Sequence, residues 1–280
     1  MGLPMAGHLL DAGHRLVVHT RTRSKADELL ARGAKYADSP ADAAKNAEVV
    51  FICVPDTPDV AAVTLGERGI VHAAREGLIV VDHSTISPSA TRQIAEQFAQ
   101  RGAAFLDAPI SGGDVGAKNA TLAIMVGGDE RAFARVEPLL RQMGKTITHC
   151  GPSGAGQLTK LVNQILVGVN LLAVSEALTF AKKNGLDLAK TIAAVGGGAA
   201  SSWQLLNLGP KIAAADYRPG FMIDLMQKDL RLILGAANAS STPVPAASLL
   251  HQLFNAAQAD EHGRDGTQAL YTVLEKLARL

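Results

Sequence analysis

The stretch LIVVDHSTISPSATRQIAEQFAQRGAAFLDAP, residues 78–109, decides the fold. It opens with a short apolar run, continues with an amphipathic segment that closes at Gly102, and returns to an apolar run at residues 104–106. A buried strand, a helix and a second strand in this order form the repeating unit of a sheet with helices on its faces. The stretch therefore predicts one strand–helix–strand unit of an α/β domain.

The same alternation continues on both sides of this stretch, from residue 15 to about residue 150. Further strands are predicted at residues 15–19, 49–54 and 122–126, and further helices at residues 25–32 and 40–46. Gly33 ends the first of these helices, and Ser39 caps the second. Residues 1–152 are therefore predicted to form a Rossmann-type, doubly wound α/β domain.

The strand signals stop after Gly151, and the rest of the chain has helical periodicity. Residues 154–184 are predicted to form one helix, about 45 Å long at a rise of 1.5 Å per residue, closed by Gly185. Shorter helices are predicted at residues 188–195, 201–215, 224–238, 244–260 and 265–280. We therefore expect a second, all-helical domain over residues 153–280, which serves substrate binding and dimerisation and is joined to the first by the long helix.

The composition of the 280-residue chain excludes several classes of protein. Lys and Arg total 27 against 26 Asp and Glu, so no overall electric field attracts nucleic acid or an anionic membrane. The two cysteines, Cys53 and Cys150, and the spacing of the eight histidines predict neither a disulfide framework nor a metal site. Because the start of the chain has no signal-peptide pattern, we expect a cytoplasmic protein.

Two hydrophobic features are expected to be internal. The most apolar region, residues 161–181, includes Asn163, Gln164 and Glu176, which are too polar for burial in lipid. It is predicted to be a buried helix. Trp203 is predicted to be a core residue rather than a platform for stacking.

The chain begins with Met1-Gly2-Leu3-Pro4-Met5-Ala6, which opens a helix with no strand in front of it. Gly2 fits the third glycine of a G-x-G-x-x-G turn, which lets the helix pack close to a strand and places a pyrophosphate at the helix N-terminus. The alternative is a glycine that merely lies near a chain start. On the first interpretation, we expect the natural protein to begin upstream of Met1, with the first strand and the first two glycines.

A basic turn follows the strand predicted at residues 15–19. In NAD-binding sheets this position usually carries an Asp or Glu for the ribose 2′-hydroxyl, whereas arginine accommodates a 2′-phosphate. The turn here contains Arg21, Thr22 and Lys25. It favours NADP(H) over NAD(H), and the alternative is a solvated basic turn at a helix start.

Three further loops follow strands at the edge where a cofactor would lie. Val54 and Pro55 end one strand, and Thr85 follows the next, although the hydroxyls after that strand can also cap a helix. In the third loop, Ser111-Gly112-Gly113 exposes successive backbone amides that can bind a small carboxylate. The alternative for this loop is a glycine turn between two strands.

The sequence GAGQLTKLVNQ, residues 154–164, carries the strongest chemical signal. Lys160 precedes Asn163 and Gln164 by three and four residues, so the three side chains share one helical face. An ammonium group beside amides suits carbonyl reduction, because lysine can protonate the forming alkoxide. The alternative is a polar seam between helices.

Lys228 and Asp229 are adjacent in an apolar helix, where such a pair is usually a solvent-facing salt bridge.

Seven motifs, in this order along nearly the whole chain, resemble those of the β-hydroxyacid dehydrogenase family. They are Met1-Gly2-x-x-Met5-Ala6, Arg21-Thr22-x-x-Lys25, Asp82-x-Ser84-Thr85-x-x-Pro88, Asp107-Ala108-Pro109-x-Ser111-Gly112-Gly113, Met125-Val126-Gly127-Gly128, Gly154-x-Gly156-x-x-x-Lys160-x-x-Asn163 and Lys228-Asp229-Leu230. The set is specific, although no single motif is.

The resemblance implies a role for each candidate residue. Lys160 is the catalytic general acid, and Lys228 reaches both the nicotinamide and the substrate. Relatives often carry Asn at the position of Gln164, so Asn163 and Gln164 both stay candidates for the amide contact. The substrate carboxylate side is bound by Ser111, Gly112 and Gly113, and the cofactor is lined by Gly2, Val54, Pro55 and Thr85.

Within the family, the similarity is closest to tartronate semialdehyde reductases, also called 2-hydroxy-3-oxopropionate reductases. It implies NADPH-dependent reduction of a small aldehyde acid to glycerate by a homodimer or homotetramer. The alternatives are a 3-hydroxyisobutyrate dehydrogenase or another short 3-hydroxyacid dehydrogenase. Outside this class, the alternative is a catalytically silent dinucleotide-binding module used in assembly.

Overall fold

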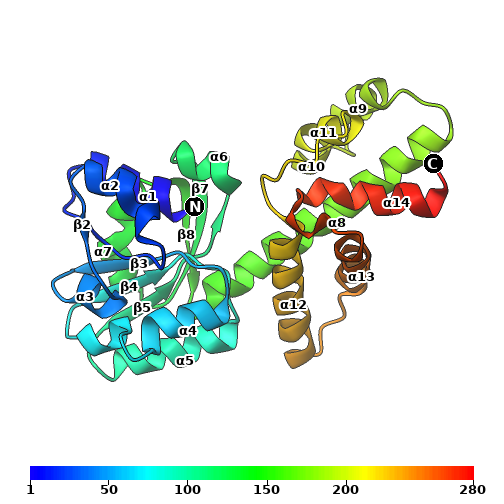
Figure 1. Ribbon diagram of the computed structural model, residues 1–280. Helices are drawn as coiled ribbons and strands as arrows, with labels where there is room; N and C mark the ends of the chain where they lie inside the picture. Colours follow the sequence, from blue (N-terminus) through cyan, green and yellow to red (C-terminus); the bar gives the residue numbers. More distant parts are fainter. The chain divides into compact units, whose positions relative to one another are not determined.

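The computed structural model describes all 280 residues (Figure 1). The chain divides into two compact units, Met1–Lys160 and Leu161–Leu280, which are described separately below. The first unit is α/β and the second is helical, so the predicted order of the two fold classes is confirmed. The domain boundary predicted after residue 152 stays a prediction.

A mixed sheet forms the centre of the first unit. Its strands have the order β3-β4-β5-β7-β6, and β8 pairs with β7. β3 (Val49–Ile52), β4 (Ile79–Asp82) and β5 (Ala104–Asp107) are parallel, whereas β7 (Leu122–Gly127) runs antiparallel to β5 and to β6 (Ile110–Ser111). β8 (Gly144–Gly151) is parallel to β7. The three parallel strands end at one edge, where a dinucleotide site is expected.

Two short strands lie outside this sheet. β1 (Val17–Val18) and β2 (Lys35–Tyr36) form a separate parallel pair. β1 and β3 do not pair with each other, so the unit contains two sheets rather than one. The strand predicted upstream of Met1 stays a prediction.

Helices cover both faces of the larger sheet, because successive residues of a strand point to opposite faces. Ile79 and Val81 pack in one core cluster with α1 (Gly2–Asp11) and α7 (Glu130–Leu140). Val80 packs in the other cluster with α4 (Thr57–Leu65) and α5 (Pro88–Ala99), which lie together in Figure 1. The remaining helices of the unit are η1 (Arg23–Ala26), α2 (Asp27–Ala31), α3 (Pro40–Ala44), η2 (Ile70–Ala73) and α6 (Gly113–Lys118).

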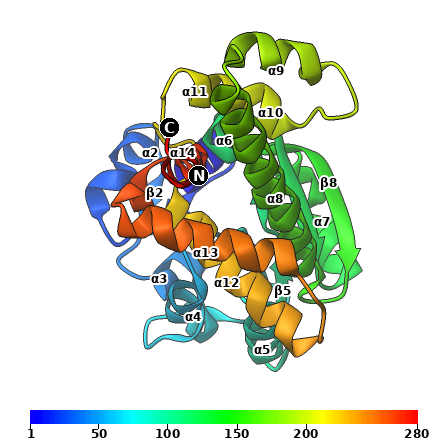
Figure 2. The same ribbon diagram turned by 90° about the vertical axis from the view of Figure 1, so that its right-hand side faces the viewer.

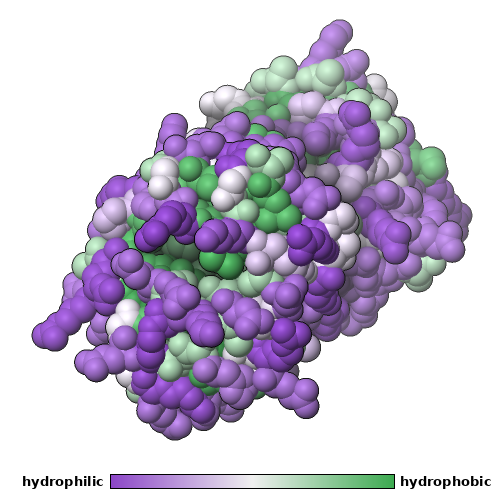
Figure 3. Space-filling model, turned by 60° about the vertical axis from the view of Figure 1, so that its left-hand side comes forward, coloured by the Kyte–Doolittle hydropathy of each residue, from purple (hydrophilic) through white to green (hydrophobic).

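Polar and charged residues cover most of the face seen in Figure 3, and apolar residues gather in smaller areas of it.

One long helix, α8 (Ala155–Lys183), enters the second unit and forms part of its core. α12 (Ile223–Ala239) and α13 (Pro245–Ala259) pack side by side (Figure 2), and α14 (Leu270–Ala278) packs against α13. The other helices of the unit are α9 (Leu188–Gly196), α10 (Trp203–Asn207), α11 (Gly209–Ala213), η3 (His262–Arg264) and η4 (Thr267–Ala269).

Two predictions for the second unit were wrong. The helix predicted at residues 201–215 is two helices, α10 and α11, with Pro210 in the first turn of α11, where its missing N–H costs no helical hydrogen bond. Trp203 is 64% exposed instead of buried. It occupies the first turn of the short helix α10, and the core side of that helix is formed by Leu205.

α8 is long and apolar enough to span a membrane by length and composition alone. Its most apolar 18-residue window is 44% buried within the protein. Gln164 and Ser175 are among the buried side chains and form hydrogen bonds there. α8 is therefore only partly buried, and the prediction of a buried helix is met in part.

Candidate active site

The ends of β3 and β4 are linked by hydrogen bonds through a serine. The Val54 N–H donates to Ser84 Oγ at 2.9 Å, and the Ser84 N–H donates to Asp82 Oδ1 at 2.9 Å. The structure therefore brings Val54 and Pro55 to the same edge as the loop that contains Thr85. This edge is where the sequence placed the cofactor.

α1 begins directly against the end of β3. A Cβ atom added to Gly2 would lie 3.4 Å from the Cβ of Cys53, which is ordinary van der Waals contact. The helix N-terminus thus meets the strand end as the glycine-turn interpretation requires. The spacing would also admit alanine, so the close approach by itself does not explain glycine.

The basic turn after β1 is exposed. Arg21 Nη1 lies 3.2 Å from Asp59 Oδ1, and the Arg21 side chain is 80% exposed. The Arg23 guanidinium lies 4.3 Å from the ring centre of Tyr36, and Thr22 and Lys25 are exposed. An exposed ion pair contributes little to stability, so Arg21 can turn toward an anionic ligand at little cost.

Asp107, at the end of β5, anchors the start of α8. Its two carboxylate oxygens accept the N–H groups of Gly154 and Gln157, both at 2.8 Å. Burial raises the pKa of this carboxyl group, and the backbone donors oppose that shift. A Cβ atom on Gly156 would lie 2.7 Å from the Asp107 carbonyl oxygen, so this glycine lets the helix start pack directly on the strand.

Gln157 adds a second anchor between α8 and the loop after β4. Its Nε2 donates to the Ser84 carbonyl oxygen at 2.8 Å, and its Oε1 accepts the Ile86 N–H at 3.1 Å. The first turn of α8, and Lys160 one turn later, are thereby fixed to the strand ends of the sheet.

The glycines of the Ser111-Gly112-Gly113 loop both have positive φ, 127° and 65°. A Cβ atom on Gly113 would meet nothing within 4 Å, so the backbone conformation alone favours glycine there. Ser111 ends β6 and Gly113 starts α6. The loop is a glycine turn, and its role in carboxylate binding stays a prediction.

Lys160 is buried, with 7% of its surface exposed. It lies on α8, three and four residues before Asn163 and Gln164, in the register that the sequence predicted. A buried ammonium group is costly unless other groups solvate it, so Lys160 is a candidate for the site, and its catalytic role stays a prediction.

In the helical unit, a chain of buried polar groups connects α8 to α12. Asn163 Nδ2 donates to Gln164 Oε1 at 2.8 Å, and Gln164 Nε2 donates to Asp229 Oδ2 at 2.5 Å. Lys228 Nζ lies 2.7 Å from Asp229 Oδ1. The structure thus connects Asn163 and Gln164, which the sequence proposed together, with Lys228, which it proposed separately.

The Asp229 carboxylate sets the direction of these hydrogen bonds, because a carboxylate can only accept them. Gln164 must turn its N–H toward Asp229, and its carbonyl then receives Asn163. The nitrogen and the oxygen of the Gln164 side-chain amide are therefore both hydrogen-bonded within the protein. Asn163, which is half-buried, is the outer amide of the pair.

Asp229 is the residue that the sequence interpretation missed. The pair with Lys228 was expected on the solvent face, yet the two side chains are only 3% and 10% exposed. This expectation was wrong because five consecutive residues of α12, Met226 to Leu230, are all buried, and the pair is among them. The sequence feature that could have revealed this buried pair is a Lys next to an Asp within an otherwise mainly apolar helix.

Comparisons with known proteins agree with this arrangement. Residues 1–151 match the NAD binding domain of 6-phosphogluconate dehydrogenase, and residues 154–274 match the NAD-binding family of NADP-dependent 3-hydroxyisobutyrate dehydrogenase. The fold and site thus define a nicotinamide-dependent dehydrogenase.

Individual relatives narrow the class. The 2-hydroxy-3-oxopropionate reductase of Escherichia coli K12 is 44% identical over 99% of this chain and 95% of that protein. The Mycobacterium tuberculosis 3-hydroxyisobutyrate dehydrogenase structure with L-serine has a TM-score of 0.88 and 32% identity, covering 98% of this chain and 95% of that one. The structure of Psf3 in complex with NADP+ and 2-OPP has a TM-score of 0.88 and 26% identity, and the match covers 98% of this chain and 96% of that one.

The chain belongs to the 3-hydroxyisobutyrate dehydrogenase-like family of β-hydroxyacid dehydrogenases. It is an NAD(P)-dependent oxidoreductase that acts on small hydroxyacids, so the alternative of a silent assembly module is set aside.

Proposed function

We propose that this enzyme reduces tartronate semialdehyde to glycerate with NADPH. The proposed substrate is supported by the 44% identity to the E. coli reductase over almost the whole of both chains. The observation that carries the chemistry is the buried Lys160 one turn before the amides of Asn163 and Gln164. Reduction of an aldehyde needs one proton for each hydride, and this face of α8 offers an acid beside amide donors.

NADPH, when bound, supplies the hydride. The Lys160 ammonium donates its proton to the aldehyde oxygen as that oxygen gains negative charge, and the Asn163 side chain orients the same oxygen. Asp229 holds Gln164 and Lys228 in place, so Gln164 acts as the support of Asn163. Lys228 is proposed to reach both cofactor and substrate, and the loop of Ser111, Gly112 and Gly113 is proposed to bind the substrate carboxylate.

The residues present at the strand ends fit a dinucleotide. Gly2 at the start of α1, together with Val54, Pro55 and Thr85, would line it, and the position of the α1 N-terminus beside the end of β3 supports this assignment. Arg21, Thr22 and Lys25 would hold the 2′-phosphate of NADPH. The exposure of these three residues and the positive charge of Arg21 and Lys25 support a preference for NADPH over NADH.

The test measures NADPH oxidation with tartronate semialdehyde for the wild type and for Lys160→Met, which keeps most of the stem and removes the proton donor. We expect kcat/KM to fall about 10²–10⁴-fold in this variant. Lys190→Ala, which removes an exposed lysine on α9, is the matched control and should keep full activity. Wild-type protein that binds NADPH but leaves tartronate semialdehyde unreduced would refute the proposed substrate.

A second candidate reaction is the oxidation of 3-hydroxyisobutyrate or L-serine. It is favoured by the M. tuberculosis 3-hydroxyisobutyrate dehydrogenase structure, which holds L-serine. Hydroxyl and methyl groups at one substrate position differ by only about 1–3 kcal/mol in a pocket, so kcat/KM must be compared for all three compounds. The compound with the highest kcat/KM decides between the two candidates.

We also propose that the enzyme is a homodimer or homotetramer. Exposed apolar side chains on the helical unit, including Leu166 (59%) and Phe180 (69%), support this assembly.

A further inference from the structure

Gln157, in the first turn of α8, forms hydrogen bonds to two different strand ends. Its backbone N–H donates to Asp107 Oδ2 at 2.8 Å. Its side-chain Nε2 donates to the Ser84 carbonyl oxygen at 2.8 Å, and its Oε1 accepts the Ile86 N–H at 3.1 Å. The residue is fully buried. We call the two side-chain hydrogen bonds the Gln157 clamp, and they hold the residues immediately before and after Thr85.

We propose that Gln157 is a positioning residue, which holds the loop of residues 84–86 in fixed register with Lys160. Lys160 follows Gln157 by three positions on α8, so the two residues are neighbours on the helix surface. The inference rests on the proposed function, in which Thr85 lines the cofactor and Lys160 donates the proton. The clamp then sets the place of the cofactor relative to the proton donor.

The clamp reaches a second segment of the cofactor edge through Ser84. Ser84 Oγ accepts the Val54 N–H at 2.9 Å, and the Ser84 N–H donates to Asp82 Oδ1 at 2.9 Å. Asp82 and Ser84 are buried, with 0% and 3% exposure. Because the Ser84 carbonyl is bonded to Gln157 and its hydroxyl to Val54, the loops after β3 and β4 are both tied to the start of α8.

Different groups hold the helix and the loop. Asp107 binds α8 through the backbone N–H groups of Gly154 and Gln157, which remain when the Gln157 side chain is changed. A substitution of this side chain therefore leaves α8 attached to β5 and releases the loop. It also leaves the buried Ser84 carbonyl and Ile86 N–H without these partners, and the loop must shift to satisfy them.

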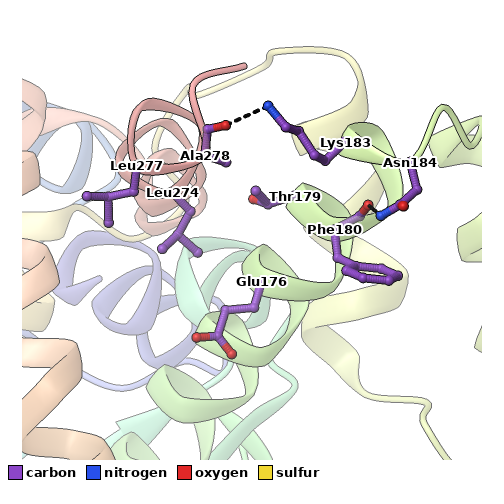
Figure 4. Close-up of a pocket in the computed structure, with 8 residues that line it drawn as sticks. All are labelled: Glu176, Thr179, Phe180, Lys183, Asn184, Leu274, Leu277 and Ala278. Atoms are coloured by element: carbon purple, nitrogen blue, oxygen red, sulfur yellow. Dashed lines mark hydrogen bonds between the residues drawn. The ribbon is translucent and has the colours of Figure 1, made fainter.

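An apolar groove on the same helix lies far from the clamp. It has a volume of about 540 Å³ and lies between the last turns of α8 and α14, with Phe180 and Leu277 in its lining (Figure 4). Phe180 comes 20 positions after Lys160, which is about 30 Å along a helix at a rise of 1.5 Å per residue. The groove therefore takes no part in holding Lys160 against the cofactor loop.

The first test is Gln157→Met, which removes both hydrogen bonds of the clamp at nearly constant volume. The dissociation constant of NADP+, measured by isothermal titration calorimetry, should rise about tenfold, because the loop is no longer held in its binding position. With NADPH and tartronate semialdehyde, kcat should fall about 10²-fold, since the proton donor and the cofactor lose their register. Gln93→Met, at an exposed position of α5, is the matched control and should change neither value.

Gln157→Glu supplies a readout that a merely structural role would not move. A protonated carboxyl group has the shape of the amide and offers one donor and one acceptor, whereas a carboxylate only accepts. Burial and the neighbouring Asp107 carboxylate raise the pKa of the introduced carboxyl group, and Asp82 and His83 are the other titratable groups beside the clamp. Relative to the wild type at the same pH, we expect weak NADP+ binding and low kcat near pH 8 and recovery of both to within about threefold near pH 5.5. Gln157→Met should stay impaired at both.

Circular dichroism at each pH measures the folded fraction, so unfolding is kept apart from loss of positioning. If Gln157→Met does not fold, the pH comparison of Gln157→Glu decides alone. Wild-type NADP+ affinity and kcat in Gln157→Met, or an equal defect of Gln157→Glu at both pH values, would overturn the proposal. The proposed function fails separately: an active Lys160→Met would refute the proton donor, while NADP+ binding by the Gln157 variants would still test the clamp.

Discussion

Gln164 and Asp229 are 65 positions apart in the chain, yet Gln164 Nε2 donates a hydrogen bond of 2.5 Å to Asp229 Oδ2. Both side chains are buried, with 3% and 2% exposure. The carboxylate orients the Gln164 amide and also pairs with Lys228 on α12. One buried acid thus organises two residues that the sequence proposed for the site, and its removal gives the most direct test of the arrangement.

Asp229→Asn should lower the free energy of unfolding by about 3 kcal/mol, because it leaves the buried Lys228 ammonium without its counter-charge. Urea denaturation at neutral pH measures the change. Turnover should also fall, since the single oxygen of the new side-chain amide can no longer accept from both Gln164 and Lys228.

A double variant separates the structural role of this pair from its role in activity. Lys228→Met with Asp229→Leu replaces both charges by apolar groups and should recover only part of the lost stability, because the buried Gln164 amide then has no acceptor. Turnover should stay low. If the double variant regains turnover together with stability, the pair only supports the fold.

Arg21→Ala should raise the KM for NADPH about tenfold and leave the KM for NADH within twofold, because NADH lacks the 2′-phosphate. Initial rates with each cofactor measure this ratio. Arg68→Ala removes another exposed arginine in an ion pair, with Asp42, and is the control. Equal effects on both cofactors would show that Arg21 does not contact the 2′-phosphate.

Two glycine-to-alanine changes in helices should have opposite effects on stability. Gly156→Ala would bring a Cβ atom within 2.7 Å of the Asp107 carbonyl oxygen and even closer to the Met125 carbonyl oxygen, so we expect a loss of more than about 2 kcal/mol. Gly235→Ala, inside α12 with nothing within 4 Å, should gain about 0.5–1 kcal/mol. Thermal unfolding of both variants checks the signs, and a stable Gly156→Ala would contradict the close packing of α8 on the sheet.

Stability should fall in mild acid because of His83. Burial lowers the pKa of this side chain from 6.5 to about 4, although its Nδ1 bonds to the Ala108 carbonyl oxygen at 2.7 Å. The unfolded chain binds a proton near pH 6.5 and the folded protein does so only near pH 4. The histidine therefore destabilises the fold as the pH drops through this window, by about 2 kcal/mol at pH 5.

Urea denaturation of His83→Gln at about pH 7.5 and pH 5 tests this effect. The variant should lose the part of the pH dependence that His83 contributes, whereas His72→Gln, at an exposed position, should keep it. Identical pH dependence in the wild type and in His83→Gln would refute the assignment.

Local patterns in the sequence were enough to predict much of this protein. The alternation of apolar runs with amphipathic segments predicted β3, β4, β5 and β7 to within a few residues, because strands buried on both faces are continuous apolar runs. Helix α8 was predicted at residues 154–184 and spans Ala155–Lys183. The register of Lys160, Asn163 and Gln164 also follows from helix geometry alone.

Other strands and helices could not be read from local patterns. β8 (Gly144–Gly151) was missed because Lys145, Thr146 and Thr148 make it polar, and its pairing with β7 is what makes it a strand. α4 and α7 were likewise not predicted. Trp203 was assigned to the core on its chemistry, although its position on a short helix leaves it exposed.

The sequence by itself determined the fold class and the family motifs, because strand and helix periodicity and the order of short motifs are local properties of the chain. Only the tertiary structure decided which distant groups meet. Asp107 accepts the N–H groups of Gly154 and Gln157, 47 and 50 positions away, and Asp229 joins Gln164 across 65 positions. The physical reason is that a buried carboxylate must find donors wherever packing brings them, and packing is set by the whole chain.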